Sequence, residues 1–197
     1  MRTQTVTTNI FTFGELDDDA KEKARDWYRE GALDYEWWNC VYDDAKEIAV
    51  LMGIEIDDIF FSGFTSQGDG AQFTGRYYYK KGSVAAVKAY APQDETLHAI
   101  AQSLVDIQRP RFYQIYASVE RHGHYCHAYC TSINVMAEHE MNAPKDVEDA
   151  IQEALRDYMN WIYKRLEETH DHLMSDESAD DMIMSNEYEF TADGAPT

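Results

Sequence analysis

Residues 112–137 read FYQIYASVERHGHYCHAYCTSINVMA. Apolar and polar side chains alternate on both sides of His122-Gly123, and alternation with a period of two is the pattern of a strand with one buried face. The stretch therefore predicts a long β-hairpin, with strands over 112–121 and 124–137. It decides the fold because the segments around it are mostly helical, so its sheet must pack against helices.

The segment after this hairpin predicts the longest helix of the chain. Pro144 suits a helix start, and apolar residues from Val147 to Leu166 recur at three- and four-residue steps, so that a helix over about 145–172 presents one stripe to the sheet. We expect a short helix capped by Ser175, an edge strand over 188–191 and a frayed tail over 192–197.

The segment before the hairpin predicts a second hairpin, further helices and an N-terminal strand. Two β-rich runs at 59–64 and 71–79 are joined by the polar, glycine-containing residues 65–70. Several other stretches contain alanines and charged residues at helical spacing, which predicts helices. The N-terminal segment is rich in β-branched residues, which predicts a strand. Helices are predicted over about 17–31, 34–52, 81–91 and 94–107, and a strand over 3–13.

The order of these elements predicts an α+β fold with a mainly antiparallel sheet. The sheet would be built from two hairpins and an N-terminal strand, and several helices would cover it, including the long C-terminal helix. A chain of 197 residues can bury one sizeable core. We find no internal repeat and no linker, so we expect a single α+β domain over residues 1–191 and a tail over 192–197.

The charge pattern restricts the class of partner. The net charge is −20, and residues 15–60 hold 15 acids against 5 bases, while residues 138–197 hold 17 against 4. A surface of this sign repels nucleic acid and anionic lipid. We therefore expect a basic host protein or nucleoprotein complex as the partner, with no direct nucleic acid and no membrane, and the sequence indicates no oligomeric state.

Cysteine content and hydropathy indicate a cytoplasmic protein. No run of about 18 apolar residues occurs, and the first residues lack the apolar stretch of a signal peptide. Three cysteines, an odd number without disulfide-framework spacing, suit a reducing compartment. We expect Cys40, Cys126 and Cys130 to be free thiols.

One segment invites a metal interpretation. Residues 122–130 (HGHYCHAYC) contain five possible ligands of a soft metal. On a strand, His124, Cys126 and Cys130 would share one face, but their spacing fits neither a zinc finger nor a zinc ribbon. The favoured interpretation is a packed strand with no metal and no cofactor, and a metal-dependent enzyme built around these three residues is the alternative.

The sequence shows no convincing catalytic set. Residues 66–70 (SQGDG) lack the lysine and the following helix of a phosphate-binding loop. Asp69 is expected to satisfy backbone groups of a turn instead. No Ser/His/Asp, Cys/His or paired-carboxylate arrangement stands out, so we expect no catalytic residues and no enzymatic activity.

Two stretches carry a resemblance to a known group of proteins. Residues 61–75 (FSGFTSQGDGAQFTG) and 186–194 (NEYEFTADG) are similar to segments of small uncharacterised tailed-phage and prophage proteins, some of them labelled antitoxin-like. The opening threonine-rich segment and residues 17–28 resemble them as well. The resemblance implies a phage context, in which small acidic proteins are often inhibitors of host defence, including anti-CRISPR proteins.

These observations lead to a functional hypothesis. Carboxylates spaced along rigid helices can imitate the charge of a nucleic acid and speed association with a basic surface. We expect a phage-encoded acidic binding protein that inhibits a host defence complex by occupying such a surface. An antitoxin-like protein that neutralises a toxin is the other binding alternative. The expected contact residues are Trp37, Asp43, Asp44, Glu47, Glu148, Asp149, Glu153 and Asp157.

Overall fold

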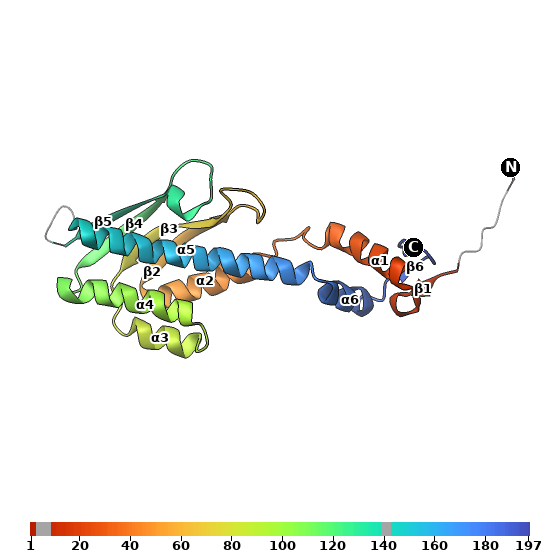
Figure 1. The fold of residues 1–197 in the computed structure, drawn as a ribbon, viewed down its shortest axis with the longest axis horizontal. Helices are drawn as coiled ribbons and strands as arrows, with labels where there is room; N and C mark the ends of the chain where they lie inside the picture. Colours follow the sequence, from red (N-terminus) through yellow and green to blue (C-terminus); the bar gives the residue numbers. More distant parts are fainter. Residues whose placement is uncertain (3–8, 139–142) are drawn as a thin grey trace. The chain divides into compact units, whose positions relative to one another are not determined.

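The computed structural model describes residues 1–2, 9–138 and 143–197 (Figure 1). Its contacts divide the chain into two compact units, which we describe separately. Unit 1 contains Met1–Trp37 and Glu168–Thr197, and unit 2 contains Trp38–Glu167. The single domain expected over 1–191 stays a prediction, because two compact units of one chain can still unfold as one.

The fold class is α+β, as the sequence predicted. Unit 2 holds a four-stranded antiparallel sheet in the order β2-β3-β4-β5. Among the described residues, its helices include the long helix predicted after the second hairpin. The strands are β2 (Ile54–Phe61), β3 (Ala71–Tyr78), β4 (Ile115–Arg121) and β5 (Thr131–Ala137), and the helices are α2 (Asn39–Met52), α3 (Ser83–Tyr90), α4 (Glu95–Gln108) and α5 (Lys145–Leu173).

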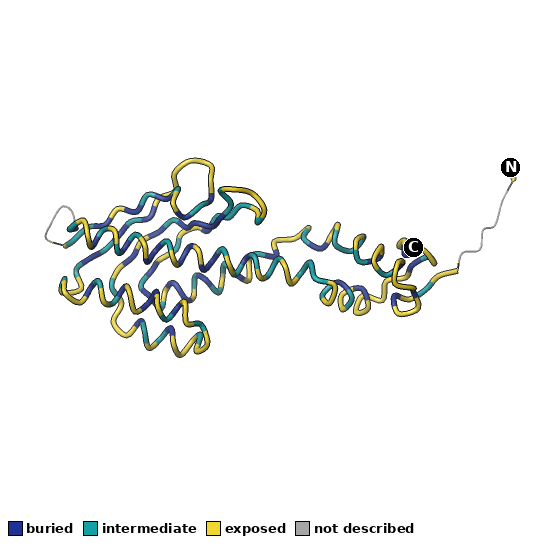
Figure 2. The backbone as a smooth tube through the Cα atoms, in the orientation of Figure 1, coloured by how far each residue is buried: buried dark blue, intermediate teal, exposed yellow. Residues whose placement is uncertain are grey.

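One face of the sheet forms the core of unit 2. Phe73 of β3 packs edge-on against Tyr158 of α5, with ring centroids 6.2 Å apart, and the Tyr158 hydroxyl donates to the carbonyl of Ala45 in α2. Along β4 and β5, buried residues alternate with more exposed ones, so that one side of each strand is buried, as the colours of Figure 2 indicate. The sheet is thus held by α2 and α5 on a single face.

The second hairpin is shorter than predicted. Residues 122–130 leave the strand and form a loop that ends in the 3₁₀ turn η3 (Ala128–Cys130). The buried Gln72 donates to the carbonyl of Tyr125 at 2.9 Å and accepts from the Thr131 hydroxyl at 2.9 Å. The Gln72 side chain therefore satisfies the Tyr125 carbonyl, a backbone group that strand pairing would otherwise have satisfied, and alternation alone could not indicate this.

Unit 1 joins the two ends of the chain. It contains α1 (Asp18–Gly31), α6 (Asp176–Ser185) and the antiparallel two-residue strands β1 (Phe11–Thr12) and β6 (Glu189–Phe190). Residues from both ends of the sequence make one small core. Its buried members are Phe13, Leu16, Ala20, Ala24, Ile183 and Phe190.

The predicted N-terminal strand and the predicted frayed tail lie at the two ends of the chain. Of the strand predicted over 3–13, residues 3–8 lie outside the described residues, and β1 covers only Phe11–Thr12. The tail over 192–197 was expected to fray, but Pro196 bridges to Phe190. Gly194 has φ +83°, and a Cβ there would lie 2.1 Å from the Ala20 carbonyl oxygen. A close approach that only glycine permits thus packs the tail against α1.

Candidate partner-binding surface

Two arginines tie α1 to α6 in unit 1. Arg25 makes a bidentate pair with Asp180, with Nε–Oδ1 at 2.6 Å and Nη2–Oδ2 at 2.8 Å. Arg29 pairs with Asp26 at 3.0 Å and also with Asp176. Both arginine side chains are only 18% exposed. Their charge is therefore used inside the unit, and bidentate pairing of this kind also fixes the geometry of the two helices.

Folding concentrates the acidity of the chain in unit 1. Met1–Trp37 holds nine acids and five bases, and Glu168–Thr197 holds nine acids and no lysine or arginine. Unit 1 thus carries −13 of the net charge of −20, with roughly a third of the residues. Since Arg25 and Arg29 are engaged, Arg2, Lys21 and Lys23 are the remaining bases.

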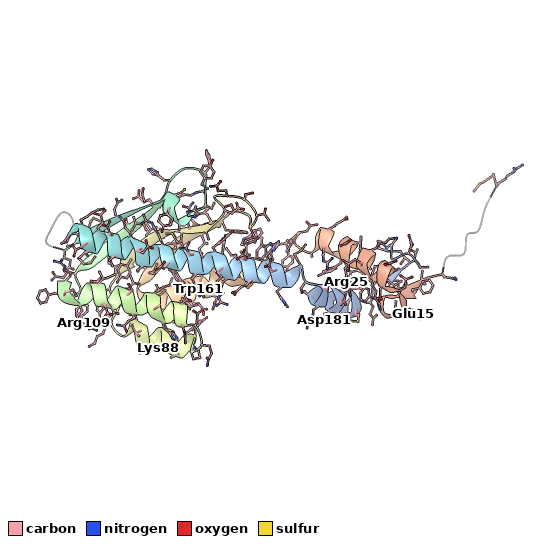
Figure 3. The ribbon with its side chains drawn as sticks, in the orientation of Figure 1. Glu15, Arg25, Lys88, Arg109, Trp161 and Asp181 are labelled. Carbon is pink, nitrogen blue, oxygen red and sulfur yellow. The ribbon has the colours of Figure 1, made fainter. Side chains whose placement is uncertain are left out.

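We give six of these acids the collective name unit 1 acidic surface. All six are exposed, and none has an ion pair within the described part of the chain. They come from α1, from the turn that follows it and from α6, and Figure 3 labels Asp181 together with Arg25. The six are Asp18, Asp19, Glu30, Asp34, Glu177 and Asp181.

The predicted contact residues on α2 are partly engaged. Asp43 is exposed, whereas Asp44 and Glu47 accept hydrogen bonds from the Tyr90 hydroxyl at 2.7 and 3.0 Å. These two hydrogen bonds, that of Asp44 first, raise the pKa of Tyr90 well above its ordinary value. These acids therefore serve partly to join α2 to α3.

The predicted contact residues on α5 fall into two groups. The Nζ of Lys145 lies 3.6 Å from Oε2 of Glu148 and 2.9 Å from Oδ1 of Asp149. Part of the negative charge of these two acids is therefore neutralised locally. Glu153 and Asp157 are exposed, and partial desolvation together with the charge of Glu153 raises the pKa of Asp157. Their roles as contact residues stay predictions.

A groove between α4 and α5 begins beside Asp157. Its volume is about 500 Å³, and Ile100 and Trp161 line its apolar part. Asp94, the N-cap of α4, accepts from the Trp161 indole at 2.8 Å and from Arg165 at 3.0 Å. The groove is thus bordered by a polar network that fixes the two helices against each other.

Trp37 is not an exposed aromatic anchor. Its side chain is 6% exposed, and its ring lies 5.9 Å from that of His170. Trp38 is half-buried, and its ring centroid lies 5.7 Å from that of Phe61. Both indoles are therefore largely removed from water, which stabilises the fold more than exposure would. The exposed aromatic contact expected at Trp37 is therefore buried in the structure, and its role as a contact residue stays a prediction.

The histidine- and cysteine-rich segment does not form a ligand set. His122 and His124 are exposed, Cys126 is buried, and the Nδ1 of His127 accepts the Tyr129 amide at 3.2 Å. Across the described ranges, no group of three or more His, Cys, Asp or Glu side chains is placed to hold a metal ion. The absence of a metal stays a prediction, and the three cysteines are free thiols.

Asp69, in the loop between β2 and β3, has the structural role expected for it. Its Oδ2 accepts the backbone N–H groups of Thr65 at 3.0 Å and Ser66 at 2.7 Å. In this loop, Gly68 has a positive φ of +96°. Gly70 is constrained differently, because a Cβ there would lie 3.0 Å from the Cys126 carbonyl oxygen.

The contact residues predicted from the sequence include none of the six acids of the unit 1 acidic surface. The prediction chose positions on α2 and α5, although the count already indicated that charge lies at the two ends of the sequence. The signal was present, but the pairing of those ends in unit 1 was not visible in it.

Among the helices that the structure describes, none combines the length and the apolar character needed to cross a membrane.

Comparisons with curated proteins and with solved structures found no match. A family model, described as a domain of unknown function (DUF8835), matches residues 37–176, which include all of unit 2 and leave out most of unit 1. Since this range covers more than half of the chain, the protein belongs to the DUF8835 family.

Proposed function

We propose that this protein is a binding protein whose unit 1 acidic surface occupies a basic, nucleic-acid-binding surface of a partner protein. One observation carries the proposal: unit 1 concentrates 18 acids against five bases in a small unit and uses two of those bases internally. Carboxylates held on α1 and α6 present fixed negative charge, which steers a basic partner and fixes its orientation.

The proposed setting follows from the resemblance stated above. In it, the partner is a host defence complex, and the phage-encoded protein acts as an anti-CRISPR-like inhibitor in the host cytoplasm without covalent chemistry. An antitoxin-like function uses the same charge complementarity against a toxin, and the identity of the captured partner separates the two. The metal-dependent alternative gains no support from the placement of His124, Cys126 and Cys130.

The test begins with capture of the partner from the host lysate and continues with binding titrations. One variant carries Glu30→Lys, Asp34→Lys and Asp181→Lys on the unit 1 acidic surface. The matched control carries Asp43→Lys, Glu153→Lys and Asp157→Lys, so both variants change the net charge by the same amount. Exposed substitutions of this kind usually change stability by less than about 0.5 kcal/mol.

We expect the unit 1 variant to bind at least about tenfold more weakly, equivalent to about 1.4 kcal/mol, and the control about threefold or less. Binding should weaken as salt rises, because the Debye length falls from about 10 Å at 0.1 M to 3 Å at 1 M. Nucleic acid should compete for the partner. If only the control variant loses affinity, the surface lies on α2 and α5; if neither does and salt has no effect, the proposal is wrong.

A further inference from the structure

The two edge strands of the unit 2 sheet differ in character. β2, at one edge, carries a register shift between Ile56 and Asp58 and the carboxylates of Glu55, Asp57 and Asp58. Bulges and charges are the features by which natural sheets prevent an edge from pairing with another chain. The β2 edge is therefore protected.

β5, at the other edge, has none of these features. Its seven residues, TSINVMA, include no charge, no proline and no glycine, and its register with β4 is continuous from Thr131 to Ala137. Charged residues make up 27% of the chain, so an uncharged edge strand of this length departs from its composition. Figure 1 shows β5 at the margin of the sheet. Such an edge is a template for strand addition.

The hydrogen bonds show which backbone groups of β5 face outward. The Glu138 N–H donates to the carbonyl of Gln114 in the β4 direction, at 3.1 Å. The backbone N–H and C=O groups of successive residues point to opposite sides of a strand. Those of Asn134 and Met136 therefore also point toward β4, and those of Ile133 and Val135 point away from it. Gln152 confirms this independently, since its Nε2 reaches the outward carbonyl of Ile133 at 3.0 Å. That oxygen retains a second lone pair.

We propose that β5 pairs antiparallel with β5 of a second copy of this chain, about a twofold axis at Asn134. In this register the outward groups of Ile133 meet those of Val135 of the second copy. These two apolar side chains lie on the helix-covered face, where both are buried in the single chain. Asn134 is exposed on the open face and meets its own equivalent. Every directly opposed pair within the strand is uncharged, so the strand is self-complementary.

The self-complementarity of the uncharged β5 strand points to a second copy as the occupant. Two chains of −20 repel at long range, and an uncharged strand is where they can touch without opposed carboxylates. Added salt screens this repulsion and should strengthen the dimer. Binding of a basic partner should weaken under the same change. The two proposals therefore fail separately, because their salt dependences have opposite sign.

The test is sedimentation of the full chain over about 1–500 μM at about 0.1 and 0.5 M salt. Asn134→Lys places two ammonium groups side by side at the twofold axis. Thr74→Lys is the matched control, since it places the same charge on the open face but inside the sheet, on β3 opposite Asp58. Both should fold, because Asn134 is exposed and Thr74 is only partly buried.

We expect a dimer that tightens with salt, loses at least about tenfold in affinity in Asn134→Lys and is unchanged in Thr74→Lys. Amide hydrogen exchange gives a second readout: the N–H of Val135 should be protected at high concentration and exchange faster on dilution. A monomer throughout the range, a dimer that tolerates Asn134→Lys, or equal loss in both variants would each overturn the proposal.

Discussion

Replacing Gln108 by leucine should destabilise unit 2 strongly. Gln108 is the last residue of α4 and is fully buried. Its Nε2 donates to the Ile115 carbonyl at 2.6 Å, and its Oε1 accepts the Ile115 N–H at 3.1 Å. One side-chain amide thus satisfies both backbone groups of a residue at the start of β4, and it also lies 3.3 Å from the Tyr77 hydroxyl.

The magnitude follows from the groups left without partners. Leucine has a similar volume, but it cannot bond the N–H or the carbonyl of Ile115, which stay buried. Each unsatisfied group costs about 1–3 kcal/mol, and the more apolar side chain offsets up to about 1 kcal/mol. We expect a loss of about 1–6 kcal/mol, to be compared with the 5–15 kcal/mol typical of a folded domain.

Urea denaturation followed by circular dichroism measures this loss. Gln102→Leu is the control, because Gln102 is exposed on the same helix, and its free energy of unfolding should stay within about 0.5 kcal/mol of the wild type. The slope of the transition should be unchanged if only stability differs. A folded Gln108→Leu protein as stable as the control would refute the reasoning.

Three further predictions concern the polar network, the β2–β3 loop and the metal question. Burial opposes the charge of Asp94, but the Leu97 amide, Trp161 and Arg165 outweigh it and lower its pKa. Its contribution is therefore present above pH about 4 and lost as pH falls through the folded pKa, so the stability difference between wild type and Asp94→Asn should shrink between pH 6 and pH 3 in thermal melts. Gly70→Val should lower the melting temperature because of its contact with Cys126, whereas Asp69→Asn should leave partner binding largely intact; a folded Asp69→Asn protein without binding would contradict the structural role. Elemental analysis of untagged protein should find no stoichiometric zinc, and one zinc per chain, lost together with folding in Cys126→Ser, would overturn that expectation.

Local pattern determined most secondary structure in this chain. Helical spacing and capping residues indicated α5 and α6, and Ser175 indeed caps α6 through the Ser178 amide. Gly53 ends α2 in the left-handed conformation, as a glycine after an apolar helix predicts. Such signals act between near neighbours in sequence, so that one sequence suffices to read them.

Tertiary structure decided the features that depend on distant residues. Alternation extended a strand through residues 122–130, but this segment is a loop in which Gln72, far away in sequence, donates to the carbonyl of Tyr125. Two adjacent indoles could not be assigned to core or surface until the partner of Trp37 was known.

The same distinction applies to the candidate surface. The sequence by itself determined the net charge and its position at the two ends of the chain. Only the tertiary structure brought α1 and α6 together through Arg25 and Asp180, and so turned two separate acidic stretches into one acidic unit. Charge is a property of composition, whereas a charged surface depends on long-range packing, which local sequence patterns do not encode.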